Sequence, residues 1–280
     1  MTEVPNVRLN NGVEIPQLGF GVYQIEPEET VEAVSHALRT GYRHIDTAQM
    51  YRNEKEVGQA IAESGIDRAD IFVTTKLAND KHDFDAALAA FDQSLADLRL
   101  DRVDLFLIHW PLPTVGDGNY VGTWKALERI YTDGRARSIG VSNFQPHHLR
   151  KLHADAGIRP AVNQIELHPY LTQDELRAFD ADHEIATEAW SPIAQGAVLS
   201  DPTILELART YGKTPAQVVL RWHLQLGTIV FPKSVTPERV RENFDIFDFE
   251  ISTGDLGLIS ALNKSERIGP DPDTFDYVPG

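Results

Sequence analysis

The sequence predicts a (β/α)₈ barrel with an N-terminal β-hairpin and an additional C-terminal helix and tail. Eight short apolar segments alternate with eight helical segments, which is typical of a parallel sheet covered by helices. A length of 280 residues also suits a barrel. The alternative, an open doubly wound sheet, usually carries GxGxxG after its first strand, but this segment is GFGVYQ. No linker or composition break interrupts the pattern, so we expect a single domain over residues 1–280.

The chain is expected to begin with a β-hairpin, because Asn11-Gly12 lies between short alternating segments in VRLNNGVEIP. Both residues tolerate positive φ, which predicts a type I′ turn. The barrel strands that follow are short and mostly apolar or β-branched, as expected of strands buried on both faces. These strands are expected at residues 17–22, 44–47, 71–76, 103–108, 138–141, 161–166, 186–189 and 228–231.

Helix-start signals support the helices between these strands. Thr214 precedes Pro215 and Thr236 precedes Pro237, which places a capping hydroxyl before a proline at the first helical position. The helices are expected at residues 27–40, 54–63, 84–98, 121–132, 146–156, 173–182, 215–226 and 237–243. A further helix at 253–262 and an acidic tail at 263–280, expected to be irregular, lie outside the eightfold pattern.

The composition excludes several classes of function. Acidic residues outnumber basic ones by 42 to 26, so the formal net charge is -16. We therefore expect no binding to nucleic acid, which needs a basic face, or to an anionic membrane. The absence of cysteine excludes disulfides, thiolate zinc sites and a catalytic thiol. The start MTEVPNVRLN lacks the features of a signal peptide and no apolar run is long enough to span a bilayer, so we expect a soluble cytoplasmic protein.

Polar residues end three consecutive predicted strands. Asp46, Lys76 and His109 end the second, third and fourth strands, and Tyr51 lies in the loop after the second. Because barrel enzymes place their active sites at the carboxyl ends of the strands, we expect these four side chains at one mouth. Each residue alone also has an ordinary structural interpretation, as a helix cap, a rim residue or a packing residue.

Together, the four side chains suit the reduction of a carbonyl by hydride transfer. The carbonyl oxygen needs a proton as it becomes an alkoxide, and a tyrosine with a pKa of about 10 is a poor donor at neutral pH. We expect Lys76 to lower the pKa of Tyr51, Asp46 to hold Lys76, and His109 to orient the substrate oxygen. A Schiff-base aldolase that uses Lys76 remains an alternative.

A catalytic metal is not predicted, although the chain contains ten histidines. Neither an HxH nor an HExxH spacing occurs. His147 and His148 are adjacent at a helix start, and their side chains are expected to diverge. We therefore expect chemistry without a metal.

Long motifs run through nearly the whole chain. They are GYRHIDTAQMYRNEKEVG (41–58), TTKL (74–77), DLFLIHWP (104–111), RSIGVSNF (137–144), AVNQIELHP (161–169), AWSP (189–192) and FPKSVTPERVREN (231–243). These motifs resemble the aldo-keto reductase family. Within it, AWSP and the short loops are most similar to the bacterial 2,5-diketo-D-gluconate reductase-like group.

This resemblance implies a catalytic tetrad of Asp46, Tyr51, Lys76 and His109 and an extended NADPH bound without a Rossmann fold. The residues implied at the nicotinamide are Ser142, Asn143 and Gln164 at its carboxamide and Trp190 on its ring. Those implied at the adenosine 2′-phosphate are Lys233, Ser234, Val235, Thr236 and Arg239, with Glu242 and Asn243 at the adenine. The phosphate assignment is physically reasonable, because two cations lie beside a helix start.

The resemblance also implies an aromatic substrate pocket lined by Tyr23 and Trp110. The sugar-acid reductases have a tryptophan two residues after the catalytic lysine, where this chain has Ala78. That change would widen or depolarise one wall of the pocket, and it weakens the case for 2,5-diketo-gluconate as the substrate. Aldehydes and ketones, including dicarbonyls and keto sugar acids, are the expected substrate class. A non-catalytic NADPH-binding sensor subunit, like the channel-associated members of the family, is a further alternative. We expect a monomer.

Overall fold

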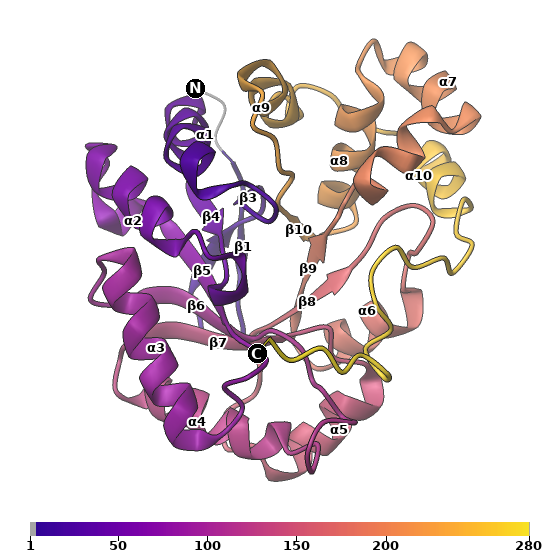
Figure 1. Cartoon of the computed structure of the whole chain (residues 1–280). Helices are drawn as coiled ribbons and strands as arrows, with labels where there is room; N and C mark the ends of the chain where they lie inside the picture. Colours follow the sequence, from indigo (N-terminus) through magenta and orange to yellow (C-terminus); the bar gives the residue numbers. More distant parts are fainter. Residues whose placement is uncertain (1–3, 280) are drawn as a thin grey trace.

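The computed structural model describes residues 4–279, which form a parallel eight-stranded barrel (Figure 1). Each strand pairs with the next one along the chain, from β3 to β10. The barrel closes where the Val230 amide donates to the Gln17 carbonyl at 2.9 Å and the Gly19 amide donates to the Val230 carbonyl at 2.8 Å. The predicted fold class is therefore confirmed. The first three residues of the segment inspected for a signal peptide, and Gly280 of the predicted tail, lie outside the described residues.

The barrel strands lie close to their predicted positions. Their bounds are Phe20–Gly21 (β3), His44–Asp46 (β4), Phe72–Leu77 (β5), Val103–Ile108 (β6), Ala136–Ser142 (β7), Val162–Glu166 (β8), Ala186–Trp190 (β9) and Ile229–Val230 (β10). The first strand is shorter than predicted, because residues before Phe20 contact β10 only through a single bridge at Leu18. The fifth strand, β7, is longer at both ends than predicted.

The predicted N-terminal hairpin is present, with β1 (Asn6–Arg8) antiparallel to β2 (Glu14–Pro16). Its turn, however, is not type I′. Gly12 has a φ of 85° whereas Asn11 does not adopt a positive φ, and the Gly12 amide donates to the Leu9 carbonyl at 2.9 Å. The loop is therefore a three-residue turn that ends in a left-handed glycine. The hairpin packs its apolar side against the N-terminal ends of the strands, opposite the predicted mouth.

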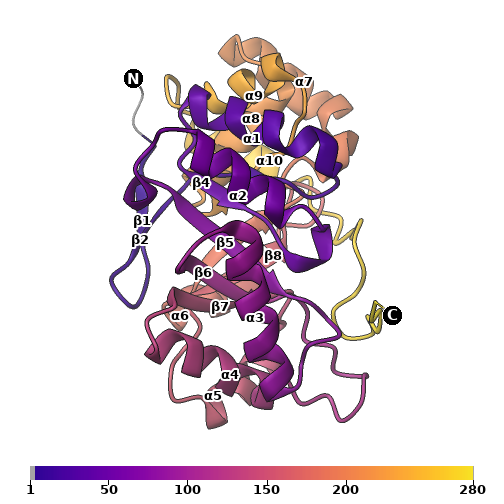
Figure 2. The same cartoon turned by 60° about the vertical axis from the view of Figure 1, so that its left-hand side comes forward.

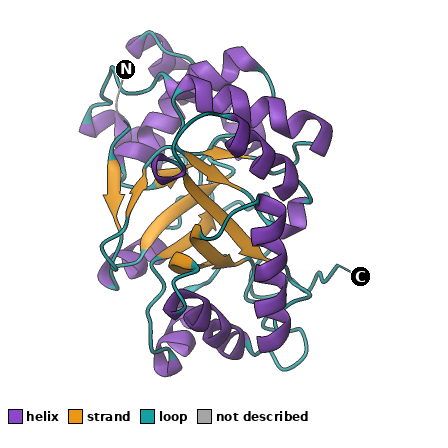
Figure 3. Ribbon diagram, turned by 90° about the vertical axis from the view of Figure 1, so that its left-hand side faces the viewer, coloured by secondary structure: helices purple, strands orange, loops and turns teal. Residues whose placement is uncertain are grey.

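Helices surround the barrel on its outside (Figure 3). Their bounds are Pro27–Thr40 (α1), Glu54–Glu63 (α2), Phe84–Leu98 (α3), Tyr120–Thr132 (α4), Pro146–Asp155 (α5), Asp174–Asp182 (α6), Pro202–Tyr211 (α7), Pro215–Gln225 (α8), Pro237–Phe244 (α9) and Thr253–Ser260 (α10). The extra C-terminal helix, α10, is confirmed. None of the helices between residues 4 and 279 is long and apolar enough to cross a membrane.

One helix, α7, was not predicted. The signals for it are present, because Asp201 accepts a hydrogen bond from the Thr203 amide at 2.9 Å and Gly212 ends the helix with a φ of 62°. A (β/α)₈ barrel has one helix after each strand, whereas here both α7 and α8 lie between β9 and β10. The Thr214 cap of α8 is confirmed, but the Thr236 side chain makes no capping bond at the start of α9.

The tail after α10 is irregular, as predicted, but it is also anchored across the mouth of the barrel (Figures 1 and 2). Glu166, at the end of β8, accepts hydrogen bonds from the Ile268 and Gly269 amides at 2.6 and 3.1 Å. Further along, the Asn79 side chain donates to the Tyr277 carbonyl at 2.9 Å. The tail therefore covers part of the end at which the strands present their polar residues.

Candidate active site

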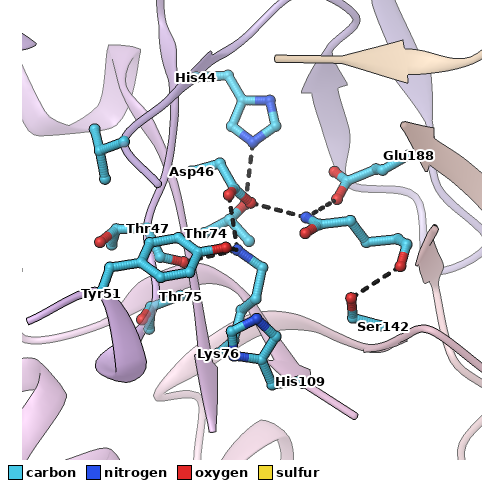
Figure 4. Close-up of polar contacts among 12 residues, drawn as sticks. His44, Asp46, Thr47, Tyr51, Thr74, Thr75, Lys76, His109, Ser142 and Glu188 are labelled. Atoms are coloured by element: carbon cyan, nitrogen blue, oxygen red, sulfur yellow. Dashed lines mark hydrogen bonds and ion pairs between the residues drawn. The ribbon is translucent and has the colours of Figure 1, made fainter. Parts of the chain in front are cut away.

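The structure brings the four predicted catalytic side chains together at the C-terminal mouth (Figure 4). Lys76, on β5, is fully buried, and its Nζ donates to Asp46 Oδ1 at 2.7 Å. The same ammonium donates to the Thr47 carbonyl at 2.9 Å and to the Tyr51 hydroxyl at 3.4 Å. Asp46 and Lys76 meet because β4 and β5 are neighbouring parallel strands in the barrel. The predicted juxtaposition of lysine and phenol is therefore present.

Tyr51 lies in a short 3-10 helix, Gln49–Tyr51 (η1), just above β4. Two hydrogen bonds of the Gln49 side chain hold this turn in place. Its nitrogen donates to the Ala90 carbonyl, and its side-chain oxygen accepts from the Ala78 amide at 2.7 Å. Gln49 lies within the motif at 41–58, but nothing in the sequence distinguishes it from the other polar residues there. These bonds hold the Tyr51 ring 4.9 Å from Lys76 Nζ, measured to the ring centroid.

The pKa of Tyr51 differs from the sequence-based expectation. Burial raises it to about 12, although Lys76 acts in the opposite direction. The expectation that the pKa of Tyr51 lies below its ordinary value was therefore wrong. Burial destabilises the phenolate by more than the nearby ammonium of Lys76 stabilises it. Tyr51 consequently keeps its proton throughout the neutral range, and Lys76 limits the cost of releasing it.

The protonation states of Lys76 and His109 depend on the same burial and on the neighbouring charges. Burial alone lowers the pKa of Lys76, but Asp46 and Tyr51 outweigh it and raise that pKa above its ordinary range. Burial, and then the charge of Lys76, lowers the pKa of His109 well below its ordinary value. His109 is therefore neutral, and its Nδ1 has no hydrogen-bond partner among the described residues. The His109 and Tyr51 rings lie with their centroids 5.7 Å apart.

The residues implied at the nicotinamide form a second connected group at the mouth. The Asn143 amide donates to the His109 carbonyl at 3.0 Å and to Ser142 Oγ at 3.1 Å. The Asn143 oxygen accepts from the Trp190 indole at 2.8 Å, and the Ser142 hydroxyl donates to the Gln164 carbonyl. The donors of Ser142 and Asn143 are thus already used within the protein, and the group lies directly beside His109.

The residues implied at the 2′-phosphate lie in the loop after β10 and at the start of α9. Lys233 and Arg239 are exposed, and neither forms an ion pair with another described residue. Ser234 Oγ accepts from the Thr236 amide at 3.1 Å, which shapes the turn between them. The remaining members differ in environment: Val235 is exposed, Glu242 accepts from Thr214, and Asn243 is buried.

The residues implied in the substrate pocket occupy the rim. Tyr23 is half-exposed and packs on Tyr51 with ring centroids 5.0 Å apart. Trp110 is nearly buried because Phe275 of the tail covers it, with ring centroids 4.3 Å apart. Ala78 lies nearby at the end of β5. The contribution of Phe275 could not be predicted, because the tail has no periodic pattern that would place it.

The expectation that His147 and His148 diverge was wrong. Their Nε2 atoms lie 3.1 and 3.4 Å from the same oxygen of Asp273 in the tail, and the three residues form a group with metal-ligand spacing. However, His148 Nδ1 accepts from the Gln145 amide at 3.1 Å, so the neutral ring carries its proton on Nε2. That nitrogen donates to Asp273, and the group clamps the tail to the start of α5.

The buried lysine–aspartate pair and the phenol lie at the C-terminal mouth of the barrel, where (β/α)₈ enzymes carry their active sites. The fold and the site therefore define a (β/α)₈-barrel enzyme. The chain matches the model of the aldo/keto reductase family over residues 17–264. It is 56% identical over 274 residues to an aldo-keto reductase of Mycolicibacterium smegmatis, covering 98% of this chain and 99% of that protein. It is 50% identical over 268 residues to a glyoxal reductase of Bacillus subtilis, covering 95% and 96%.

Among solved structures, a Gox0644 variant in complex with NADPH superposes with a TM-score of 0.94 at 45% identity, covering 99% of this chain and 100% of that one. The chain therefore belongs to the aldo/keto reductase family. It is an oxidoreductase that uses a nicotinamide cofactor, and its likeness to the 2,5-diketo-D-gluconate reductase-like group within the family is confirmed.

Proposed function

We propose that this protein reduces aldehydes and ketones to alcohols with NADPH, using Tyr51 as the general acid. The observation that carries the proposal is the position of Lys76 Nζ, 2.7 Å from Asp46 Oδ1 and 3.4 Å from the Tyr51 hydroxyl. This arrangement places a permanent ammonium beside a phenol at the end of the barrel where substrates bind. Dicarbonyls and keto sugar acids are the proposed substrates, and the monomer, acting in the cytoplasm, is the proposed active form.

Tyr51 gives its proton to the substrate oxygen as negative charge develops there. The product alkoxide is a far stronger base than a phenolate with a conjugate-acid pKa of about 12, so the transfer is downhill. Lys76 stabilises the phenolate that remains, and Asp46 keeps Lys76 charged and in place. A hydroxyl that stays protonated at neutral pH is what a donor in the reducing direction requires.

His109 orients the substrate. As a neutral imidazole it can donate one hydrogen bond to the carbonyl oxygen without competing with Tyr51 for the proton. The Asn143 amide holds the His109 backbone at 3.0 Å, which fixes the point from which the ring projects. His109 therefore selects the position of the oxygen, and Tyr51 protonates it.

NADPH, when bound, would supply the hydride. The chain's own residues fit the phosphate end of such a cofactor: Lys233 and Arg239 are exposed cations without ion pairs among the described residues, as a 2′-phosphate requires. Ser234, Val235 and Thr236 would surround the phosphate, with Glu242 and Asn243 at the adenine. At the other end, Trp190, whose indole donates to the Asn143 oxygen at 2.8 Å, would contact the nicotinamide ring, and Ser142, Asn143 and Gln164 would lie at the carboxamide.

The two alternatives are less well supported. A Schiff-base aldolase needs a lysine that loses its proton easily, whereas Asp46 and Tyr51 raise the pKa of Lys76. A non-catalytic sensor subunit would have no need of a connected Asp46–Lys76–Tyr51 group. Small dicarbonyls are favoured as substrates, because the glyoxal reductase of Bacillus subtilis is 50% identical to this chain and Phe275 narrows the pocket beside Trp110.

The direct test is Tyr51→Phe, assayed with methylglyoxal by the loss of NADPH absorbance. We expect kcat to fall by about 10²–10⁴-fold, the usual contribution of a general acid. NADPH binding, followed by quenching of protein fluorescence, should be retained, because the phenol is not among the residues proposed to hold the cofactor.

Tyr131→Phe is the matched control, since it removes a phenol on α4, away from the mouth, and should leave kcat unchanged. Near-normal turnover in Tyr51→Phe would falsify the general-acid assignment. Failure of the unaltered protein to bind NADPH or to reduce any member of a panel of aldehydes, dicarbonyls and keto sugar acids would refute the proposed reaction itself.

A further inference from the structure

A buried carboxyl that the proposed mechanism does not use lies beside the catalytic ion pair. Glu188, on β9, is fully buried, and it is the register partner of Gln164 on β8. The Gln164 side-chain nitrogen donates to Asp46 Oδ2 and to Glu188 Oε2, both at 2.8 Å. The Gln164 amide therefore bridges the carboxyls of two strands, β4 and β9. Figure 4 shows Asp46 and Glu188 near Lys76.

This bridge determines how the Gln164 amide is oriented. An amide nitrogen has two hydrogens, and here each has its own acceptor. The nitrogen must face Asp46 and Glu188, because the reverse orientation would place the amide oxygen against an oxygen of the Asp46 carboxylate. The oxygen of Gln164 is consequently turned away from them, and no described residue donates to it. It therefore remains available as an acceptor for a ligand.

The charge of the cluster supports a neutral Glu188. The Asp46 carboxylate has Lys76 as its partner, whereas Glu188 forms no ion pair with any described residue and its Oε1 has no hydrogen-bond partner. Burial, followed by the charge of Asp46, raises the pKa of Glu188 to about 8. At neutral pH Glu188 thus accepts a hydrogen bond on Oε2 without adding a second negative charge beside the ion pair.

We infer that Glu188 is a positioning residue: with Asp46 it holds the Gln164 amide so that the Gln164 oxygen accepts a hydrogen bond from the carboxamide N–H of the cofactor. The inference rests on the proposed function, in which Gln164 contacts that carboxamide. Without Glu188, one hydrogen of the amide loses its acceptor and the amide can turn away from this orientation. Glu188 acts through Gln164 and does not touch the reacting atoms.

The test compares Glu188→Met with Glu188→Gln. Methionine is similar in length but offers no strong acceptor, whereas glutamine keeps a neutral side chain with an oxygen for Gln164. We expect Glu188→Met to raise the Kd and the KM for NADPH by about tenfold, as for a lost oriented hydrogen bond, with a smaller change in kcat. Glu188→Gln should restore both constants to within about twofold.

A cofactor analogue separates positioning from a general structural effect. In the acetylpyridine analogue of NADPH a methyl ketone replaces the carboxamide, so it has no N–H to donate. Glu188→Met should weaken binding of NADPH but not of this analogue. Equal weakening of both cofactors, or an unchanged Kd for NADPH, would overturn the role of Glu188 while leaving the reductase activity standing. If the unaltered protein bound neither cofactor, the proposed function would fail, and this inference with it.

Discussion

Removing the ammonium of Lys76 tests both the stability and the chemistry of the site. In Lys76→Met the Asp46 carboxylate stays buried, with only 2% of its surface exposed, and loses the partner that now lies 2.7 Å away. Breaking a buried pair by removing one member costs about 3–5 kcal/mol, because the remaining charge is uncompensated. We therefore expect the free energy of unfolding of Lys76→Met to fall by about that amount.

The effect on turnover follows from the distance between Nζ of Lys76 and the hydroxyl of Tyr51. At 3.4 Å and an effective dielectric constant of about 20, the attraction between the ammonium and a full phenolate charge is about 5 kcal/mol. If roughly half of that charge has developed in the transition state, the barrier rises by about 2–3 kcal/mol and kcat falls by about 10²-fold.

The double variant Asp46→Asn with Lys76→Met separates the two effects. Replacing both charges with neutral groups leaves no unpaired ion, so most of the lost stability should return, whereas the low kcat should persist. The free energy of unfolding is measured by urea denaturation followed by circular dichroism, and kcat by NADPH absorbance with saturating methylglyoxal. A double variant with the kcat of the unaltered protein, or a single variant of undiminished stability, would refute this reasoning.

Two further predictions concern sites away from Lys76. Arg239→Ala should raise the KM for NADPH by about tenfold or more and leave the KM for NADH unchanged, because only the 2′-phosphate needs this cation. Asp180→Asn should change the pH dependence of stability. Burial raises the pKa of Asp180 to about 8, so the folded state keeps a proton that the unfolded chain releases above about pH 4. The stability that this group contributes is complete below about pH 4 and is lost as the pH rises to about 8. The asparagine variant lacks that loss, so its stability relative to the unaltered protein should increase by roughly 3 kcal/mol between about pH 5 and pH 8 in urea denaturation.

Each of these two predictions has a control on the same helix. Arg241, also on α9, already pairs with Glu238 at 3.1 Å, so Arg241→Ala should not alter the preference between NADPH and NADH. Asp182 is exposed on α6, and Asp182→Asn is the surface control for the same substitution on this helix. An unchanged cofactor preference in Arg239→Ala would remove that residue from the phosphate site. A stability difference for Asp180→Asn that is constant with pH would mean that Asp180 is ionised in the folded protein.

Much of the site could be predicted because strands that follow one another along the chain are neighbours in the barrel. Asp46, Lys76 and His109 lie at the carboxyl ends of successive strands, and parallel strands with right-handed connections bring these ends to one mouth. Local signals also placed most helices. Helix α7 also has local signals, the cap at Asp201 and the left-handed Gly212, but it is an additional helix between β9 and β10 and so falls outside the eightfold repeat.

Other features had no local signal. Gln49 and Glu188 resemble any other polar residue in the chain, and their importance depends on partners far away in sequence, such as Ala90 and Gln164. The net direction of the pKa of Tyr51 likewise depends on how much water the fold removes around its hydroxyl. Neither composition nor spacing measures that quantity.

The amino-acid sequence by itself determined the alternation of strands and helices, and with it the barrel and the residues at its mouth, because these depend on periodicity and short-range signals. Only the tertiary structure decided the turn at Gly12, the clamp of His147 and His148 on Asp273, and the path of the tail over Trp110. The turn depends on how the two hairpin strands pair. The clamp and the tail are contacts between segments without periodic patterns, and their energies depend on distance and burial, which exist only once the chain has folded.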